Sequence, residues 1–567
     1  MNESRNGRGD LIELIERAQT WAAEDPDEQT REELLATIAL ANLGNDNALN
    51  LLASQFAGGL TFGTAGLRAQ LGPGPARMNR VVVMQAAAGL AGYLRTHYPA
   101  NCAVVIGFDA RHKSDEFARA TAQVLAGYGI DAMLLPRPLP TPVLAFAVRH
   151  LGCAAGVMVT ASHNPACDNG YKVYLGDGCQ IIPPVDLQIA AGMQAASRLP
   201  VSSIPSGTDW VTLSDEIERA YLDAVIAHLV RTSSTGVRCV YTPLHGVGGS
   251  VFEAAVARLG WPAPERVTTQ FEPDPSFPTV AFPNPEEPGS LDLALAQASA
   301  THPDLVIAHD PDADRCAVAV RSPEHSEEIE QWRMLTGDEL GTILAWWSVQ
   351  HTNEPGSVLA QSLVSCTLLQ AIAEAAGLGY VRTLTGFKWI ARVPQLRFGY
   401  EEALGYCTQP SVVADKDGIA AALTVLACAA ALRDEGRTLL DVLDEVAEQH
   451  GVYRTAQVSI RVRQIEQIPQ IMQDWRRTPP EELGGFPVLA VIDLAQGWDA
   501  LPPTDGLVLD LGNGNRVIIR PSGTEPKVKC YLQVVEPLVD GLVQARRRAD
   551  RGLTDLQSAI RARLDTW

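Results

Sequence analysis

The chain has 567 residues, of which 46% are hydrophobic and 20% are charged, and its formal net charge is -21. This length and apolar content exclude a disordered chain and indicate several domains with cores of their own. The negative charge argues against nucleic acid or an anionic membrane as a partner, because both bind to extended basic surfaces.

The sequence contains no apolar run of the roughly 18 residues that a membrane-spanning helix needs, and its first residues lack the pattern of a signal peptide. Its ten cysteines form no Cys-x-x-Cys pair, which argues against structural zinc or a disulfide framework. We therefore expect a cytoplasmic protein. A monomer and a homodimer both stay open.

Apolar residues at helical spacing between residues 10 and 55 predict an N-terminal helical extension. From about residue 103 the pattern changes to alternating strands and helices, and this β-α-β pattern recurs twice further along the chain. After residue 452, alternating strands and a long Arg-rich helix predict an α+β domain. The expected domains are residues 1–55 (helical extension), 56–208, 209–328 and 329–452 (three related α/β domains with mixed sheets) and 453–567 (C-terminal α+β domain).

The first candidate for chemistry is the turn at residues 160–165 (Thr-Ala-Ser-His-Asn-Pro), which follows the apolar run 154–159. A hydroxyl on a sharp turn after a buried strand lies where α/β sheets bind their ligands. Ser162 is therefore a candidate nucleophile. Taken alone, the segment is equally compatible with an ordinary polar turn.

The second candidate is the acidic segment 310–315, which follows the apolar run 305–308. Asp310, Asp312 and Asp314 alternate along it, and three carboxylates that converge need a hard cation to offset their repulsion. An EF-hand is excluded because its sixth and twelfth positions are occupied here by Arg315 and Arg321. A magnesium site is expected; the alternative is an acidic surface loop.

The third candidate is the segment 520–527 (Arg-Pro-Ser-Gly-Thr-Glu-Pro-Lys), which follows a strand-like run. Its hydroxyls, its accessible backbone amides and the forked donors of Arg520 suit the oxygens of a phosphate group. The same composition also occurs in ordinary turns. Its interpretation as a phosphate-binding loop depends on the presence of the other two segments.

Together and in this order, the three segments resemble the phosphoserine, magnesium and phosphate-binding loops of the α-D-phosphohexomutase superfamily, which contains phosphoglucomutases and phosphomannomutases. The resemblance extends over roughly residues 55 to 535 and is closest to the branch that holds phosphopentomutases and glucose-1,6-bisphosphate synthases. It includes the further segments 61–68, 241–248, 385–388, 400–405 and 415–418.

The resemblance implies four domains around a central active-site cleft, and an isomerase that interconverts sugar 1-phosphates and 6-phosphates, or pentose 1- and 5-phosphates. The reaction would pass through a phosphoserine at Ser162 and a bisphosphate intermediate, with a sugar bisphosphate as activator. Mg²⁺ would be held by Ser162, Asp310, Asp312 and Asp314. The implied catalytic residues are Ser162, His163, Lys172, Arg68 and Arg315. The implied substrate ligands are Thr64, Arg111, Thr385, Lys388, Glu401, Lys416, Arg520, Ser522, Gly523, Thr524 and Lys527.

One position departs from the pattern of the glucose- and mannose-type enzymes. Two residues after Glu401 the chain has Ala403, where those enzymes usually carry a serine that contacts the sugar. A missing contact of this kind weakens discrimination, so a pentose phosphate becomes a candidate substrate. Two further functions stay open: a glucose-1,6-bisphosphate synthase that uses the same residues, and a non-catalytic sugar-phosphate sensor.

Overall fold

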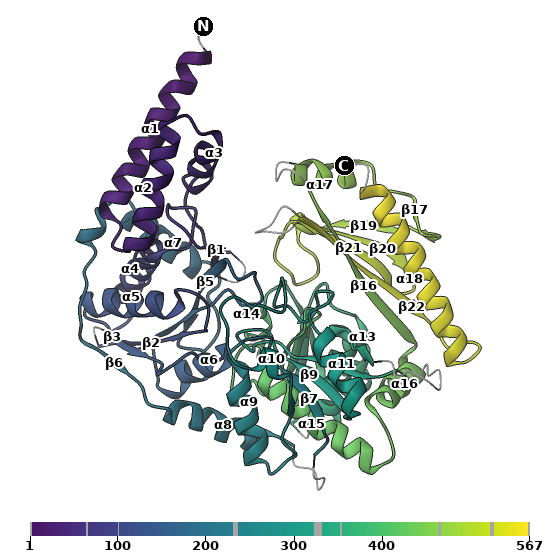
Figure 1. Ribbon diagram of the computed structural model, residues 1–567. Coiled ribbons are helices and arrows are strands. Elements are labelled where there is room, and N and C mark those ends of the chain that lie inside the picture. Colours follow the sequence, from purple (N-terminus) through teal and green to yellow (C-terminus); the bar gives the residue numbers. More distant parts are fainter. Residues whose placement is uncertain are drawn as a thin grey trace. The chain divides into compact units, whose positions relative to one another are not determined.

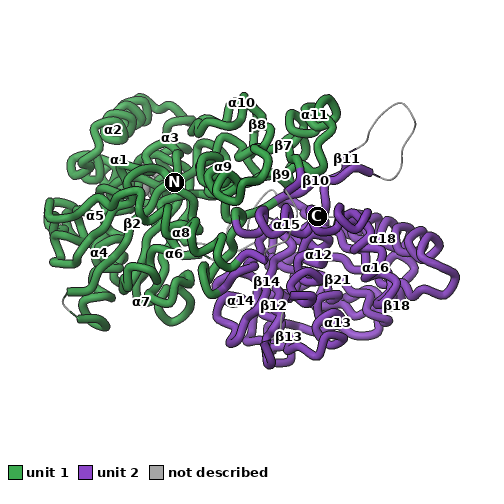
Figure 2. The backbone as a smooth tube through the Cα atoms, turned by 90° about the horizontal axis from the view of Figure 1, so that it is seen from below, with its two compact units in different colours: residues 1–228, 238–316, 411–419 green, residues 229–237, 317–410, 420–567 purple. Residues whose placement is uncertain are grey.

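The computed structural model describes residues 3–63, 66–99, 101–230, 236–322, 332–351, 354–462, 467–521 and 527–564, and for residues 3–10 it describes the backbone only (Figure 1). These residues form two compact units. Unit 1 contains residues 1–228, 238–316 and 411–419, and unit 2 contains residues 229–237, 317–410 and 420–567 (Figure 2). Within the described residues, no helix combines the length and the apolar character that a membrane crossing requires.

Three helices open unit 1: α1 (Glu3–Glu24), α2 (Glu28–Asn42) and α3 (Asp46–Gln55). The α2 and α3 helices begin at side-chain caps, since Asp27 accepts from the Gln29 amide and Asn45 from the Ala48 amide. Apolar side chains of the three helices, including the buried Leu34 and Leu52, form a small core.

A six-stranded sheet with strand order β1-β5-β4-β2-β3-β6 follows in unit 1. Strand β2 runs parallel to β3 and β4, whereas β5 is antiparallel to β4. Phe108, the last residue of β2, pairs with Val159, the last residue of β4, so the segments that follow both strands start at one edge of the sheet. The elements are β1 (Leu67–Gln70), α4 (Arg80–His97), β2 (Ala103–Phe108), α5 (Ser114–Gly127), β3 (Asp131–Leu134), α6 (Thr141–His150), β4 (Ala155–Val159), β5 (Asp168–Leu175), α7 (Val185–Ala196), the 3-10 helix η1 (Val201–Ser203) and β6 (Trp210–Thr212).

Unit 1 also contains a second α/β region. Its strand β7 is parallel to both β8 and β9, and Thr242 pairs with Ala308 at the carboxyl ends of β7 and β9. The segment 309–314 therefore begins beside the turn 243–247, as expected for ligand-binding loops of an open α/β sheet. The elements are α8 (Glu216–His228), β7 (Cys239–Thr242), α9 (Gly248–Arg258), β8 (Glu265–Arg266), α10 (Thr268–Phe271), α11 (Asp292–Thr301) and β9 (Leu305–Ala308).

The first part of unit 2 is a third α/β region. Strand β12 runs parallel to β13 and β14, and β15 is antiparallel to β14. Its four-stranded sheet has the order β13-β12-β14-β15, and the antiparallel pair β10 (Ala317–Arg321) and β11 (Trp332–Met334), which precedes it in unit 2, is not part of that sheet. The elements of the region are α12 (Gly337–Gln350), β12 (Val358–Ser362), α13 (Leu368–Ala375), β13 (Gly379–Thr383), α14 (Phe387–Ile390), β14 (Leu396–Glu401), β15 (Gly405–Cys407), α15 (Gly418–Asp434) and α16 (Leu439–His450).

The last part of unit 2 is a five-stranded sheet with strand order β16-β22-β21-β20-β19, in which each pair of neighbouring strands is antiparallel. Its core includes the buried Trp475 of α17 and Leu556 of α18. The predicted fold class, three α/β regions and a different α+β region, is confirmed. The elements are β16 (Val452–Arg461), α17 (Gln467–Arg477), β17 (Glu482–Leu483), β18 (Phe486–Pro487), β19 (Ala490–Asp493), η2 (Leu494–Gln496), β20 (Leu507–Gly512), β21 (Asn515–Pro521), β22 (Lys527–Glu536) and α18 (Leu542–Leu564).

Candidate active site

The Ser162 side chain lies in unit 1 at the start of a strained turn after β4. Its backbone φ is 54°, a left-handed value that costs energy in a residue with a Cβ atom and that occurs often at functional sites. The Ser162 amide donates to Thr160 Oγ1 (2.8 Å), which stabilises the turn. The Ser162 hydroxyl donates to Asp310 Oδ2 (2.8 Å) and lies 3.1 Å from His163 Nδ1. The turn therefore directs the hydroxyl at the acidic segment.

Arg111 and Asp109 hold this turn in place through hydrogen bonds. The Arg111 guanidinium is buried, and it donates to four backbone carbonyls of the serine loop: those of Ser162 (2.6 Å), Asn164 (2.6 Å), Pro165 (2.8 Å) and Asp168 (3.2 Å). Asp109 accepts from Thr160 Oγ1 (2.6 Å) and pairs with Arg111 (3.4 Å). Arg111, predicted as a substrate ligand, thus holds the loop in this structure, and its contact with substrate stays a prediction.

The three aspartates of the acidic segment are completely buried, and one carboxylate oxygen of each lies within 4.8 Å of those of the others. Lys172 donates to Asp312 Oδ2 (2.7 Å) and Asp314 Oδ2 (2.8 Å). The Oδ1 atoms of both residues are buried without a hydrogen-bond partner among the described residues. Unpartnered carboxylate oxygens are costly in a protein interior and are the ligands that hard divalent cations take. The cluster therefore fits a metal ion.

The charges around the aspartates separate their pKa values. Burial and the two neighbouring carboxylates raise the pKa of Asp310 well above its usual range. Burial also opposes ionisation of Asp314, but Lys172, Lys416 and Arg315 outweigh it and hold the Asp314 pKa well below its usual range. Burial lowers the Lys172 pKa, whereas Asp312 and Asp314 raise it more strongly, so Lys172 keeps its charge.

Further cations surround the cluster. Lys416 donates to Asp314 Oδ2 (2.5 Å). The Arg315 amide donates to Asp310 Oδ1 (3.1 Å), and its guanidinium lies 3.6 Å from Glu286. Arg68 donates to Asn164 Oδ1 (3.3 Å) in the serine loop. Although the whole chain carries a charge of -21, four cationic side chains, Lys172, Lys416, Arg315 and Arg68, gather around the three aspartates.

His163 is the second titratable group beside the serine hydroxyl, 3.1 Å from it, after Asp310 at 2.8 Å. Burial, followed by the charges of Arg315 and Arg68, lowers its pKa well below the usual value of 6.5. The ring is therefore neutral at physiological pH and can accept a proton.

Unit 2 holds the other described candidates. The Gly386 amide donates to Glu401 Oε1 (2.7 Å), so this carboxylate fixes the turn that carries Thr385. Arg520 donates to the Thr385 hydroxyl. Lys388 lies on the short helix α14 and is largely buried, and Lys527 begins β22 opposite Arg461. Thr385, Glu401 and Arg520 thus form one group within this unit.

Four predicted site residues lie outside the described residues, namely Thr64, Ser522, Gly523 and Thr524. The prediction of one central cleft shared by all four domains stays a prediction.

Thr141 contacts the aspartate cluster, although the sequence pattern does not single it out. Thr141 begins α6, its hydroxyl donates to Asp312 Oδ2 (2.6 Å), and its amide donates to the Asp312 carbonyl (2.9 Å). It is 171 positions away from Asp312 in the sequence, and a Thr at a helix start is ordinary. Only the three-dimensional pairing identifies it.

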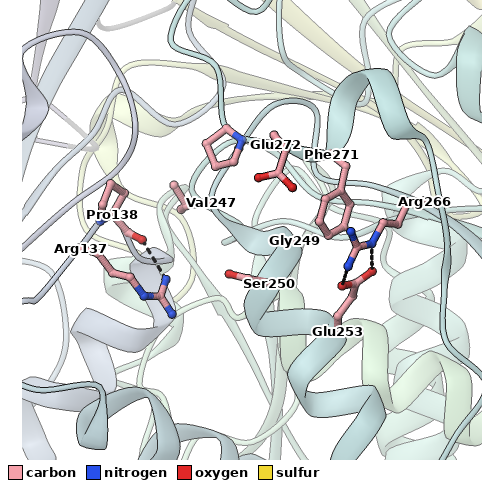
Figure 3. Close-up of a pocket in the computed structure, with 11 residues that line it drawn as sticks. Arg137, Pro138, Val247, Gly249, Ser250, Glu253, Arg266, Phe271 and Glu272 are labelled. Carbon is pink, nitrogen blue, oxygen red and sulfur yellow. Dashed lines mark hydrogen bonds and ion pairs between the residues drawn. The ribbon is translucent and has the colours of Figure 1, made fainter.

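A separate cavity of about 380 Å³ lies in unit 1 beside the start of α9 (Figure 3). Its described lining contains none of the predicted site residues. Its two arginines are paired with carboxylates, Arg266 with Glu253 and Arg137 with Glu218. The cavity is therefore distinct from the serine and aspartate cluster.

Four family models match consecutive parts of the chain. They are the phosphoglucomutase/phosphomannomutase alpha/beta/alpha domains I, II and III and the C-terminal domain, which match residues 59–199, 219–323, 336–450 and 460–538. The chain belongs to the phosphoglucomutase/phosphomannomutase family. The predicted membership is thereby confirmed, and a phospho-sugar mutase is the activity that it supports.

Named relatives agree with this membership. This chain is 44% identical over 487 residues to the "probable phosphomannomutase" of Haemophilus influenzae, and the match covers 85% of this chain and 97% of that protein. It is 37% identical to the "probable phosphoribomutase" of Schizosaccharomyces pombe (92% and 93% covered) and 35% identical to the phosphopentomutase of Homo sapiens (94% and 93%). A phosphoglucomutase/phosphomannomutase family protein from Burkholderia thailandensis shares the fold, with a TM-score of 0.66 at 18% identity (88% and 97% covered).

Proposed function

We propose that this phospho-sugar mutase transfers a phosphoryl group between Ser162 and a sugar phosphate, and so interconverts sugar 1-phosphates with 6-phosphates or, for a pentose, 5-phosphates. The observation that carries the proposal is the Ser162 hydroxyl, held in a strained turn and hydrogen-bonded to Asp310 in a cluster of three buried aspartates. The predicted cytoplasmic location and the predicted domain limits belong to the same proposal.

In the reaction, a sugar hydroxyl attacks the phosphorus of the phosphorylated Ser162, the bond to Oγ breaks, and a sugar bisphosphate forms. The other phosphate of that intermediate then returns to Ser162, so the enzyme is regenerated. His163 and Lys172 are the candidates for handling the proton of the attacking hydroxyl and the charge that develops on the oxygens. The neutral His163 ring can accept that proton and return it to the departing Ser162 oxygen, whereas the charged Lys172 can stabilise negative charge. Arg68 and Arg315 add positive charge beside the phosphoryl group.

We propose Mg²⁺ as the cation of Asp310, Asp312, Asp314 and the serine phosphate, and a sugar bisphosphate as activator. When bound, Mg²⁺ offsets the negative charge of the transferring phosphoryl group. Lys172 and Thr141 donate hydrogen bonds to Oδ2 of Asp312, so the Oδ1 atoms of Asp312 and Asp314 stay available for the ion. Thr385, Lys388, Glu401, Lys416, Arg520 and Lys527, with the undescribed loop residues, remain proposed substrate ligands.

The test is a magnesium-dependent assay of the purified enzyme with the 1-phosphates of glucose, mannose, ribose and deoxyribose, each with its bisphosphate. We expect conversion of at least one sugar to its 6- or 5-phosphate, and none by Ser162→Ala. A matched Ser203→Ala variant, which changes an exposed serine, should keep full activity. Bisphosphate formation from 1,3-bisphosphoglycerate without isomerisation would replace the mutase by a bisphosphate synthase. Sugar-phosphate binding without either reaction would indicate a sensor.

A further inference from the structure

The segment 411–419 belongs to unit 1, although the residues on both sides of it belong to unit 2 (Figure 2). We call residues 411–419 the strap. Lys416 of the strap contacts Asp314 through its ammonium group, and only 12% of its side chain is exposed. Three sets of hydrogen bonds hold the strap, and with it this contact, in place.

The acids on either side of Lys416 are buried and anchored by different elements. Asp415 accepts from the phenol of Tyr174 in β5 (3.0 Å) and from Gln180 Nε2 (2.8 Å). Asp417 accepts from the phenol of Tyr221 in α8, with 3.0 Å to each carboxylate oxygen. Two regions of unit 1 that lie far apart in the sequence therefore grip the strap on both sides of Lys416.

A third anchor acts on the strap backbone at Gly418. Its amide donates to the Ala313 carbonyl (3.2 Å), and its carbonyl accepts from His309 Nε2 (3.0 Å), whose other ring nitrogen lies 3.0 Å from the Tyr241 hydroxyl. A Cβ atom at Gly418 would lie 2.3 Å from the Arg315 carbonyl oxygen. The strap is thus packed directly against the loop that carries the three aspartates.

The two oxygens of the Asp314 carboxylate have different surroundings. Lys172 and Lys416 both donate to Oδ2, and Oδ1 is the oxygen without a partner. An ammonium group held on Oδ2 leaves Oδ1 available, and its positive charge limits how tightly a second cation binds there. The placement of Lys416 therefore sets the metal affinity of Asp314.

We propose that Asp415 and Asp417 are positioning residues that, through Tyr174, Gln180 and Tyr221, fix the ammonium group of Lys416 on Asp314. The proposal rests on the proposed function for its catalytic consequence, but its geometry can be tested without turnover. Buried hydrogen bonds to carboxylates are strong enough for the loss of one phenol to release the lysine measurably.

The first experiment measures the position of Lys416. The full-length protein is labelled with acetic anhydride, and the acetylation rate of each lysine is determined by peptide mass spectrometry. We expect Tyr221→Phe and Tyr174→Phe to raise the rate at Lys416 about tenfold, the equivalent of one hydrogen bond. Gln180→Met probes the same anchor at constant volume and serves if a tyrosine variant fails to fold. Tyr406→Phe is the control, since this buried phenol donates to Gly337 in unit 2.

The second experiment measures Mn²⁺ binding to the same variants by calorimetry. Lys416→Met should tighten binding about tenfold because a like charge beside the cation is removed. Tyr221→Phe should tighten it in the same direction, and should have no further effect in the Lys416→Met background. A purely structural role of the strap would instead weaken Mn²⁺ binding in both backgrounds. That result, or unchanged acetylation of Lys416 in both Tyr221→Phe and Gln180→Met, would overturn the proposal. Failure of the sugar assay alone would count against the mutase and leave the strap intact.

Discussion

Asp314 of unit 1 and Asp338 of unit 2 are both buried carboxylates, yet their surroundings differ in kind. Asp338 accepts from the Cys366 amide (2.8 Å), the Tyr400 phenol (2.9 Å) and the Thr455 hydroxyl (2.7 Å), so both of its oxygens have partners. Asp314 has two lysines on one oxygen and no described partner on the other. Neutral donors that satisfy every oxygen mark a structural carboxylate, whereas paired charge with one oxygen left over marks a ligand site.

The largest expected effect comes from removing the charge that balances the unit 1 cluster. Lys172→Met leaves Asp312 and Asp314 without their shared buried cation, and the free energy of unfolding of the metal-free protein should fall by about 3–5 kcal/mol. Urea unfolding measures this loss. Saturating Mn²⁺ should recover part of it, because the ion binds only the folded cluster.

Lys113→Met is the matched control for this loss. Lys113 bridges Asp27 and Glu116 near the surface, so its replacement should cost at most about 1 kcal/mol. Equal losses in the two lysine variants would contradict the distinction between the clusters.

The second prediction concerns pH and unit 2. Burial raises the pKa of Asp338 from 3.8 to about 6. The folded protein therefore binds a proton at Asp338 that the unfolded chain releases near pH 3.8, so this residue costs stability progressively as pH rises through that window. The cost should reach about 3 kcal/mol above pH 6 and should be absent below pH 3.8.

Asp338→Asn removes this titration while it keeps the size of the side chain. The difference in unfolding free energy between wild type and Asp338→Asn should therefore shift in favour of the variant by about 3 kcal/mol between about pH 4 and about pH 7. Urea unfolding at several pH values within this range gives the difference. A pH-independent difference would show that Asp338 ionises normally in the folded state.

The third and smallest prediction compares two threonines that donate to these carboxylates. Thr141→Val removes the hydrogen bond to Asp312 and should weaken Mn²⁺ binding about 10–100-fold, as is usual for groups that orient metal ligands. Thr455→Val removes the corresponding bond to Asp338 and should leave Mn²⁺ binding unchanged. Calorimetric titration with Mn²⁺ measures the affinity of both variants. An equal effect of the two would remove the basis for calling one cluster a ligand site.

The sequence predicted the fold class and the acidic cluster because both depend on local patterns. Alternating aspartates after an apolar strand are visible in one dimension, and so is the serine turn. The contacts of Thr141 and Arg111 were not predictable, since they depend on which loops meet at the edge of the folded sheet. The anchoring of Asp415 by Tyr174, 241 positions earlier, is of the same kind.

The most direct test of the account is the phosphorylation state of the enzyme. The protein is incubated with a sugar 1,6-bisphosphate and Mg²⁺ and then analysed by intact and peptide mass spectrometry. We predict one phosphoryl group, located on Ser162, that passes to a sugar monophosphate when this is added in excess. A phosphoryl group on another residue, or none at all in an enzyme that still isomerises the sugar, would contradict it.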